Sequence, residues 1–219
     1  MLENISEQFS TLDKKIVTAD WERKLKFLKK YKNMYLYNRI GPLIIGVYLK
    51  MGRTNTYYTP IYYVHNLCRE FPQIMLTMCI EGKMISIKNH NEMYVSVAEL
   101  LTNQAFIPMG GDLTIDNIIS GYERYFRDPD ISSFVEYEDL ALICGWTKNV
   151  DKIEYALDIV HKSLKSWPEE RYFSQYGGFE NWFSHLEREV WAGDVLNDIC
   201  EAELLKHKLT KVPERKIIL

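Results

Sequence analysis

Hydrophobic and polar residues follow two different periods along the chain, and the change of period divides it into regions. Between residues 39 and 88, β-branched and aromatic residues form short runs separated by turn residues, a pattern typical of β-strands. The runs predict two antiparallel hairpins, 40–50 with 56–65 and 73–80 with 84–88, the second turning at Glu81-Gly82-Lys83. We expect this block to form a mostly antiparallel sheet.

Before the sheet region, apolar residues recur every three or four positions, as on the buried face of an amphipathic helix. Segment 2–31 contains two such faces, with a helix cap at Thr18 or Asp20 between them. The two faces consist of Ile5, Phe9, Leu12 and Ile16, and then of Trp21, Leu25 and Leu28. The lysines of 24–32 surround the second face, where a solvated helix surface is their expected role.

After the sheet region the pattern is helical to the end. We expect helices at about 97–104, from a cap at Asp112 or Thr114 to 126, at 134–144, from a cap at Asn149 or Asp151 to Pro168, and after Gly177-Gly178. Gly145 is the expected C-cap of the 134–144 helix, and Gly193 bends or divides the last one. The final residues, 217–219, either dock as an edge strand or fray.

Strands in one block with helices on either side predict the α+β class. The sheet at about 39–88 would be covered by N-terminal helices and a helical C-terminal half. We favour a single domain over 1–219; the alternative is an α+β unit, 1–127, and a helical unit, 128–219. Fifteen tyrosines add an expectation for the sheet: strand alternation separates Tyr58 and Tyr62 from Tyr57 and Tyr63, so one set enters the core and the other is partly exposed.

Charge is distributed unevenly around the net value of -3. Residues 128–205 contain six Lys/Arg against seventeen Asp/Glu, interleaved with aromatic residues. Such a surface attracts a basic protein and is of the wrong sign for direct nucleic-acid binding. We therefore predict partner-binding residues among the acidic and aromatic side chains of this block: Glu136, Glu138, Asp139, Trp167, Glu169, Glu170, Tyr172, Tyr176, Trp182, Glu187, Asp194 and Asp198.

Motifs for chemistry are missing from the sequence. It has no GxSxG elbow, no phosphate-binding glycine pattern and no second close ligand pair that would complete a zinc site, so we predict no catalytic residue, metal or cofactor. The alternative is a small-molecule hydrolase or transferase with a pocket formed by His65, His90 and Asp112. That hypothesis requires the three side chains to converge within about 10 Å.

The four cysteines, Cys68, Cys79, Cys144 and Cys200, form no close pair and lie in apolar runs, which predicts buried free thiols in a reducing compartment. The N-terminus has no basic and apolar leader pattern, and no run approaches the roughly 18 uncharged residues of a membrane span. We expect a cytoplasmic protein without membrane association.

One resemblance adds to these expectations. The segment 40–49 leading to 58–67, together with an acidic aromatic C-terminal half and the lack of catalytic motifs, resembles the immunity proteins that bacteria keep beside polymorphic or contact-dependent toxins. The resemblance concerns the whole chain and assigns no individual residue. It implies a tight, stoichiometric inhibitor of a cognate toxin, often a nuclease, that blocks the active site or an adjacent surface. A scaffold that binds another partner or itself is a further alternative.

Overall fold

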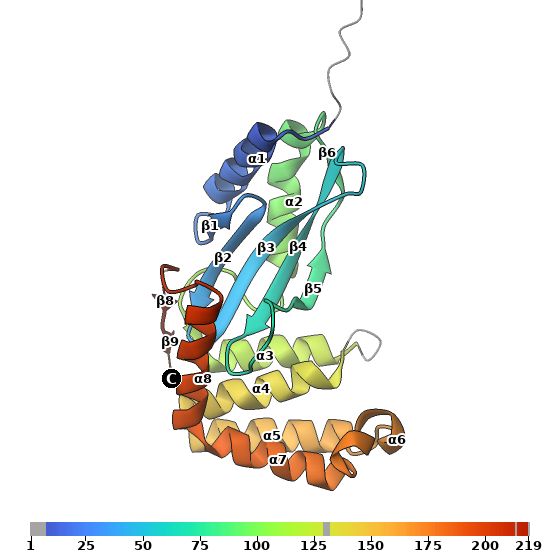
Figure 1. The fold of residues 1–219 in the computed structure, drawn as a ribbon, viewed down its shortest axis with the longest axis vertical. Helices are drawn as coiled ribbons and strands as arrows, with labels where there is room; N and C mark the ends of the chain where they lie inside the picture. Colours follow the sequence, from blue (N-terminus) through green and yellow to red (C-terminus); the bar gives the residue numbers. More distant parts are fainter. Residues whose placement is uncertain (1–7, 129–131, 213, 219) are drawn as a thin grey trace, which may run out of the picture.

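The computed structural model describes residues 8–128, 132–212 and 214–218. An antiparallel sheet forms one half of the molecule, and a layer of helices packs across the lower end of its strands (Figure 1). Helices α1 (Thr11–Lys24) and α2 (His90–Gln104) flank the sheet, while α8 (Gly193–Lys206) connects the helical layer with the sheet. The expected α+β class is confirmed.

The main sheet has the strand order β1-β2-β3-β4-β5. Its strands are β1 (Lys29–Lys32), β2 (Tyr35–Ile40), β3 (Leu43–Met51), β4 (Tyr57–Asn66), β5 (Thr77–Glu81) and β6 (Ile85–Ser86). The predicted first hairpin is confirmed, since β3 and β4 pair along their length from Leu43 opposite Asn66 to Met51 opposite Tyr58.

The predicted second hairpin is wrong. Strands β5 and β6 do not pair with each other; both pair with β4, one after the other along the same edge. The backbone N–H of Gly82 donates to the carbonyl of Pro60 (2.8 Å), so the chain continues along β4 where a turn was expected. The residues Glu81-Gly82-Lys83 therefore act as a connection between two short strands of one edge.

The N-terminal segment contains one helix in the described residues, where two were expected. Ser10 and Asp13 form a reciprocal capping box that starts α1 at Thr11. The predicted first apolar face is not formed, because Leu12 and Ile16 are 65% and 50% exposed; Phe9 is buried, but it precedes the helix. The predicted residue Ile5 lies outside the described residues.

The second apolar face is buried as predicted, but not all of it is helical. Trp21 lies on α1, whereas Leu25 is its C-cap and Leu28 follows in the connection to β1. Trp21 Nε1 donates to the hydroxyl of Tyr58 (3.0 Å), which fixes α1 on the sheet. The lysines that follow belong partly to β1, an exposed strand.

Most of the later helices occur where capping signals predicted them. Helix α3 (Ile115–Phe126) starts at Thr114 and α5 (Val150–Leu164) at Asn149, each with a side-chain cap. Helix α2 begins seven residues before the predicted position, since 97 was expected and His90 is observed. The remaining helical elements are α4 (Phe134–Thr147), α6 (Glu169–Tyr172), the 3-10 turn Ser174–Tyr176 and α7 (Phe179–Trp191).

Gly145 does not end α4, contrary to the sequence prediction. The helix continues to Thr147, and Lys148 adopts the left-handed cap conformation (φ 58°). Gly145 instead lies where α4 touches α7: a Cβ there would clash with the carbonyl oxygen of Val190 and lie 2.9 Å from Leu196 Cδ1. The glycine therefore permits close helix packing.

A Gly145→Ala substitution tests this role of the glycine. We expect α4 and α7 to be forced apart, lowering the free energy of unfolding by about 1–3 kcal/mol despite the higher helix propensity of alanine. Urea denaturation measures the change. Ser184→Ala, at an exposed position of α7, is the control; equal stability of both variants would show that the helices do not need the glycine.

Residues 217 and 218 dock as a strand, as one of the two alternatives predicted, while Leu219 lies outside the described residues. Strand β8 (Glu214–Arg215) pairs in parallel with β2, and β9 (Ile217–Ile218) pairs in parallel with β7 (Leu113–Thr114). The backbone N–H of Gly41 also donates to the Arg215 carbonyl (3.0 Å). These segments connect the end of the chain to the sheet and to the start of α3.

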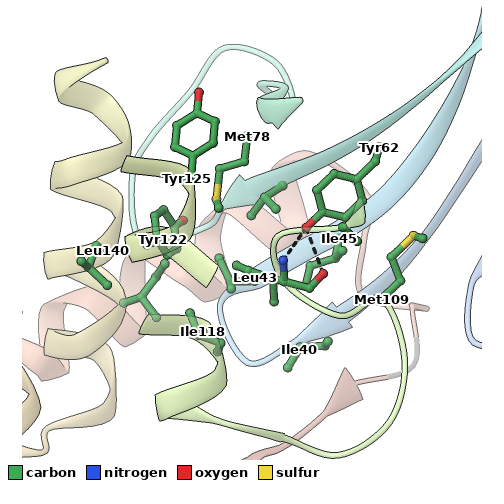
Figure 2. Close-up of a cluster of buried hydrophobic side chains, with 14 of the residues drawn as sticks. Ile40, Leu43, Ile45, Tyr62, Met78, Met109, Ile118, Tyr122, Tyr125 and Leu140 are labelled. Atoms are coloured by element: carbon green, nitrogen blue, oxygen red, sulfur yellow. Dashed lines mark hydrogen bonds between the residues drawn. The ribbon is translucent and has the colours of Figure 1, made fainter. Parts of the chain in front are cut away.

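Two hydrophobic clusters occupy the two faces of the sheet. The larger one joins the sheet to α1, α2, α3 and the helical layer. In it the Tyr62 hydroxyl donates to the Ile107 carbonyl (3.0 Å) and accepts from the Ile107 N–H (3.1 Å) (Figure 2). The smaller cluster places Tyr37, Ile44 and Tyr63 against the C-terminal half of α8. Tyr58, Tyr62 and Tyr63 are thus all buried, while Tyr57 is half-buried.

Candidate functional site

A cavity of about 580 Å³ opens between α7, α8 and the residues that follow β4. Its size lies in the range of about 300–1,000 Å³ typical of ligand and side-chain pockets. Apolar side chains from α4, α7 and α8 form most of the wall, while charged side chains interrupt it. The lining residues are Cys68, Arg69, Glu70, Glu138, Leu142, Tyr176, Trp182, His185, Leu186, Arg188, Glu189, Ala192, Val195, Leu196 and Ile199.

A buried carboxylate forms part of the cavity wall. Glu138, on α4, accepts a hydrogen bond from Trp182 Nε1 (2.7 Å) through Oε1 and forms an ion pair with Arg69 through Oε2. The guanidinium of Arg69 also lies against the ring of Phe71, 5.8 Å from its centroid. Glu138 thereby joins the segment after β4 to α7.

The adjacent Asp139 also holds the segment that follows β4, through Asn66 at the end of that strand. Asn66 donates to Asp139 Oδ1 (3.1 Å) and its own Oδ1 accepts from the Cys68 N–H (2.9 Å). Burial raises the pKa of Asp139 to about 7, and the neighbouring carboxylates act in the same direction, while Arg69 and the Asn66 hydrogen bond oppose them. A carboxyl group with a pKa near neutral is therefore buried behind the cavity wall, next to Glu138 in the chain.

Four of the predicted partner-binding residues are buried: Glu136, Glu138, Asp139 and Trp182. Glu138 and Trp182 line the cavity, whereas Glu136 and Asp139 do not. The physical reason is the position of α4, which packs against α3, α5, α7 and α8. Glu136 accepts from the N–H (2.9 Å) and hydroxyl (2.5 Å) of Ser133 and so closes the capping box of this helix. These acidic residues have structural partners within the chain.

The other predicted residues lie at or near the surface. Glu169, Glu170, Tyr176, Glu187, Asp194 and Asp198 are exposed, and Trp167 and Tyr172 are half-buried. The rings of Trp167 and Tyr172 pack together, 4.8 Å between centroids, beside α6. Glu169 accepts from the Phe179 N–H (3.2 Å), and Asp194 pairs with Lys148, so both of these carboxylates also have local contacts.

Two exposed apolar residues at the junction of α7 and α8 were missed by the sequence interpretation. Trp191 and Val195 are 46% and 55% exposed, and they are spaced four residues apart, like Glu187 and Trp191. The acidic residues Asp194 and Asp198 follow on α8. We call this set, Glu187, Trp191, Asp194, Val195 and Asp198, the junction surface; Val195 also lines the cavity.

A signal for the junction surface was present in the sequence. The apolar positions that bury α7 are Phe179, Trp182, Leu186 and Val190, and Trp191 falls beside that stripe. A large aromatic residue outside the buried stripe of an amphipathic helix indicates an exposed ring. Such rings are enriched in protein interfaces.

The chain matches no known family. Comparison with models of protein families, with curated proteins and with solved structures finds no match to it.

The alternative site at His65, His90 and Asp112 is not assembled. His65 is buried near one end of β4, where its Nδ1 accepts from the Met75 N–H (3.2 Å). His90 lies at the other end, where its ring contacts the Tyr58 hydroxyl (2.8 Å). The seven residue steps from Tyr58 to His65 correspond to roughly 23 Å of extended strand, well beyond catalytic reach. Asp112 lies exposed in the connection before β7.

The described residues form neither a metal site nor a membrane-spanning helix. No group of three or more His, Cys, Asp or Glu side chains among them is arranged to hold a metal ion. None of the helices in the described part of the chain is long and apolar enough to cross a membrane. The four cysteines are unpaired; Cys68, Cys144 and Cys200 are buried as predicted, whereas Cys79 is exposed.

Proposed function

We propose that the protein is a cytoplasmic inhibitor of the immunity type, which binds a basic protein toxin through the junction surface and the adjacent cavity. The observation that carries the proposal is the combination of exposed acidic and exposed apolar side chains beside a cavity. Trp191 and Val195 provide the exposed apolar side chains, and the exposed carboxylates of Glu187, Asp194 and Asp198 lie within four residues of one or both of them in the chain. Interfaces commonly have this arrangement of an apolar centre and a charged rim.

The charge of this region favours a basic partner. Glu187 and Asp198 form no ion pair with any of the described residues, so their charges remain available to a partner. Uncompensated surface charge of one sign accelerates association with a protein of opposite sign and makes the binding salt-dependent. A basic surface is also what a nuclease uses to hold nucleic acid, so the proposed partner is a nuclease toxin.

The cavity adds specificity to this attraction. Leu142, Trp182 and Leu196 give it apolar walls, and the exposed carboxylates of Glu70 and Glu189 lie among its lining residues. The cations of the lining have partners within the chain, since Arg69 pairs with Glu138 and Arg188 contacts His185 Nδ1. An arginine or lysine side chain suits such a space, because its stem is apolar and its head is cationic. The toxin would therefore insert a basic side chain here, and the inhibitor would cover the toxin surface around that residue.

A charge reversal tests the junction surface. We expect the double variant Glu187→Lys/Asp198→Lys to reduce capture of the partner at least about tenfold, because like charges would then face each other. The measurement is a tagged pull-down from the native cells at low and high salt, followed by mass spectrometry. Wild-type protein should recover one basic protein in equimolar amount, and less of it at high salt.

The matched control is Glu81→Lys/Glu154→Lys, which reverses two exposed charges, on β5 and α5, that likewise form no ion pair with any of the described residues. It should capture the partner like the wild type. The recovered protein, once purified, should lose its toxic activity at an equimolar ratio of inhibitor. Equal capture by both double variants, or a captured protein whose activity is unaffected, would refute the proposed function.

A further inference from the structure

A second cavity, of about 480 Å³, lies on the face of the sheet opposite α1 and α2. Strand alternation decides the face: Leu36, Val47 and Tyr62 point into the larger core, and their neighbours Tyr37, Tyr48 and Tyr63 point the other way. Five tyrosines contribute to this space, which we call the tyrosine cavity. Its lining residues are Tyr31, Lys32, Tyr35, Tyr37, Tyr48, Tyr63, Pro72, Gln73, Ile74, Met75, Leu76 and His207.

The tyrosine rings are arranged as stacking surfaces. Tyr35 and Tyr48, opposite each other on β2 and β3, stack with centroids 4.3 Å apart and planes inclined by 16°. Both are half-buried, so part of each ring is accessible. Tyr31 packs on Tyr37, with 4.9 Å between centroids. A flat aromatic ligand finds π-surfaces here at the mouth of the cavity.

The charge in the tyrosine cavity is positive. Lys32 Nζ lies 4.2 Å from the centroid of the Tyr35 ring, and no aspartate or glutamate occurs among the lining residues. The neighbouring Lys29 and Lys30 of β1 are exposed. This local charge differs from the acidic helical half, and it favours a ligand that carries an anionic group.

The floor of the cavity contains an unsatisfied polar group. Tyr37 is 1% exposed, and its hydroxyl interacts with the Tyr31 hydroxyl but makes no hydrogen bond of good geometry among the described residues. The hydroxyl of Tyr31, whose ring lies on Tyr37, is directed to the His207 carbonyl (3.1 Å). Buried hydroxyls without partners are uncommon because they lose their hydration, so this group is suited to meet a polar atom of a ligand.

We propose that the tyrosine cavity binds a nucleoside monophosphate, with the base stacked on the tyrosine rings and the phosphate beside Lys32. The base has a flat π-face that can stack on the rings, and its ring nitrogen or carbonyl can accept a hydrogen bond from the Tyr37 hydroxyl. The phosphate carries the negative charge that the lysines of β1 attract. A quaternary ammonium ligand would also suit a cage of tyrosines, but Lys32 already places a cation on one of the rings and repels a second.

Saturation-transfer difference NMR on the full chain tests the binding, with AMP, GMP, CMP and UMP as separate probes. We expect at least one of them to bind with a Kd below about 1 mM. Tetramethylammonium should show no transfer. A 5′-phosphorylated single-stranded tetranucleotide distinguishes the two sources of the same chemistry: tighter binding than the mononucleotide identifies a strand end, and equal or weaker binding identifies a free nucleotide.

Variants locate the bound nucleotide. Tyr48→Ala should weaken binding about tenfold, whereas Tyr48→Phe, which keeps the ring, should change it by less than about twofold. Lys32→Gln should weaken binding and reduce its salt dependence, and Lys26→Gln, an exposed lysine outside the cavity, should not. Tyr37→Phe should weaken binding without lowering the midpoint of urea unfolding.

The proposal is wrong if none of the four nucleotides binds to protein that is shown to be folded, if tetramethylammonium binds in their place, or if Tyr48→Ala binds as the wild type does. These outcomes are independent of the junction surface. A variant with reversed charge at Glu187 and Asp198 should bind the nucleotide normally, so failure of one proposal can be distinguished from failure of the other.

Discussion

Replacing Arg69 with methionine should lower the free energy of unfolding by about 3 kcal/mol. The substitution keeps much of the apolar stem but leaves the Glu138 carboxylate buried without its cation. Breaking one side of a buried ion pair typically costs about 3–5 kcal/mol. We expect the lower end, because the Arg69 side chain is itself 24% exposed. Urea denaturation monitored by tryptophan fluorescence measures the change.

A double-mutant cycle separates this effect from lost packing. In Arg69→Met/Glu138→Gln the buried charge is removed, while the amide oxygen of glutamine can still accept from Trp182 Nε1. We expect the double variant to recover much of the lost stability. If it is as unstable as the single variant, Arg69 acts through its packing on Phe71 and not through its charge.

The second large effect concerns Asp139, whose replacement by asparagine should stabilise the protein at pH 8 by about 2 kcal/mol or more. Burial raises the pKa of this carboxyl from 3.8 to about 7 in the folded state. Between about pH 4 and 7 the folded protein therefore keeps a proton that the unfolded chain has released. Stability consequently falls as the pH rises, by up to about 1.4 kcal/mol per pH unit, and becomes level above pH 7.

Asp139→Asn removes this slope because the amide is neutral at every pH and can still accept from Asn66. The difference between the two stability profiles should grow from pH 4 to pH 7 and then remain constant. Taking the difference also cancels the effect of His65, whose pKa burial lowers to about 4 and whose slope has the opposite sign. The control is Asp198→Asn, at an exposed position, whose stability relative to the wild type should not change progressively between pH 4 and pH 7. If both variants differ from the wild type in the same pH-dependent way, Asp139 is not the cause of the slope.

Local signals in the sequence were sufficient for much of the fold. The caps at Thr114 and Asn149 lie beside the residues that they cap, so composition and spacing alone identify where α3 and α5 begin. The β3–β4 hairpin is also local. Strand β1 could not be identified in this way, because all four of its residues are exposed and only backbone pairing with β2 makes it a strand.

The candidate site was predicted only in part, for a related reason. Whether an acidic residue lies on the surface depends on partners that are distant in sequence: Asp139 pairs with Asn66, 73 positions away. A count of charges over a segment does not distinguish the buried Asp139 from the exposed Asp198. The net charge indicated the acidic character of the helical half, but the tertiary structure determines which carboxylates a partner can meet.

Strands β8 and β9 pair with residues that are very distant in the sequence. Pairing Arg39 with Glu214 closes a loop that contains most of the molecule, and the entropy of closing a loop increases with its length. Each of these strands is two residues long and contributes few hydrogen bonds in return. The connection is therefore expected to form after the hairpin and helices that it spans, and to open before them when the native protein fluctuates.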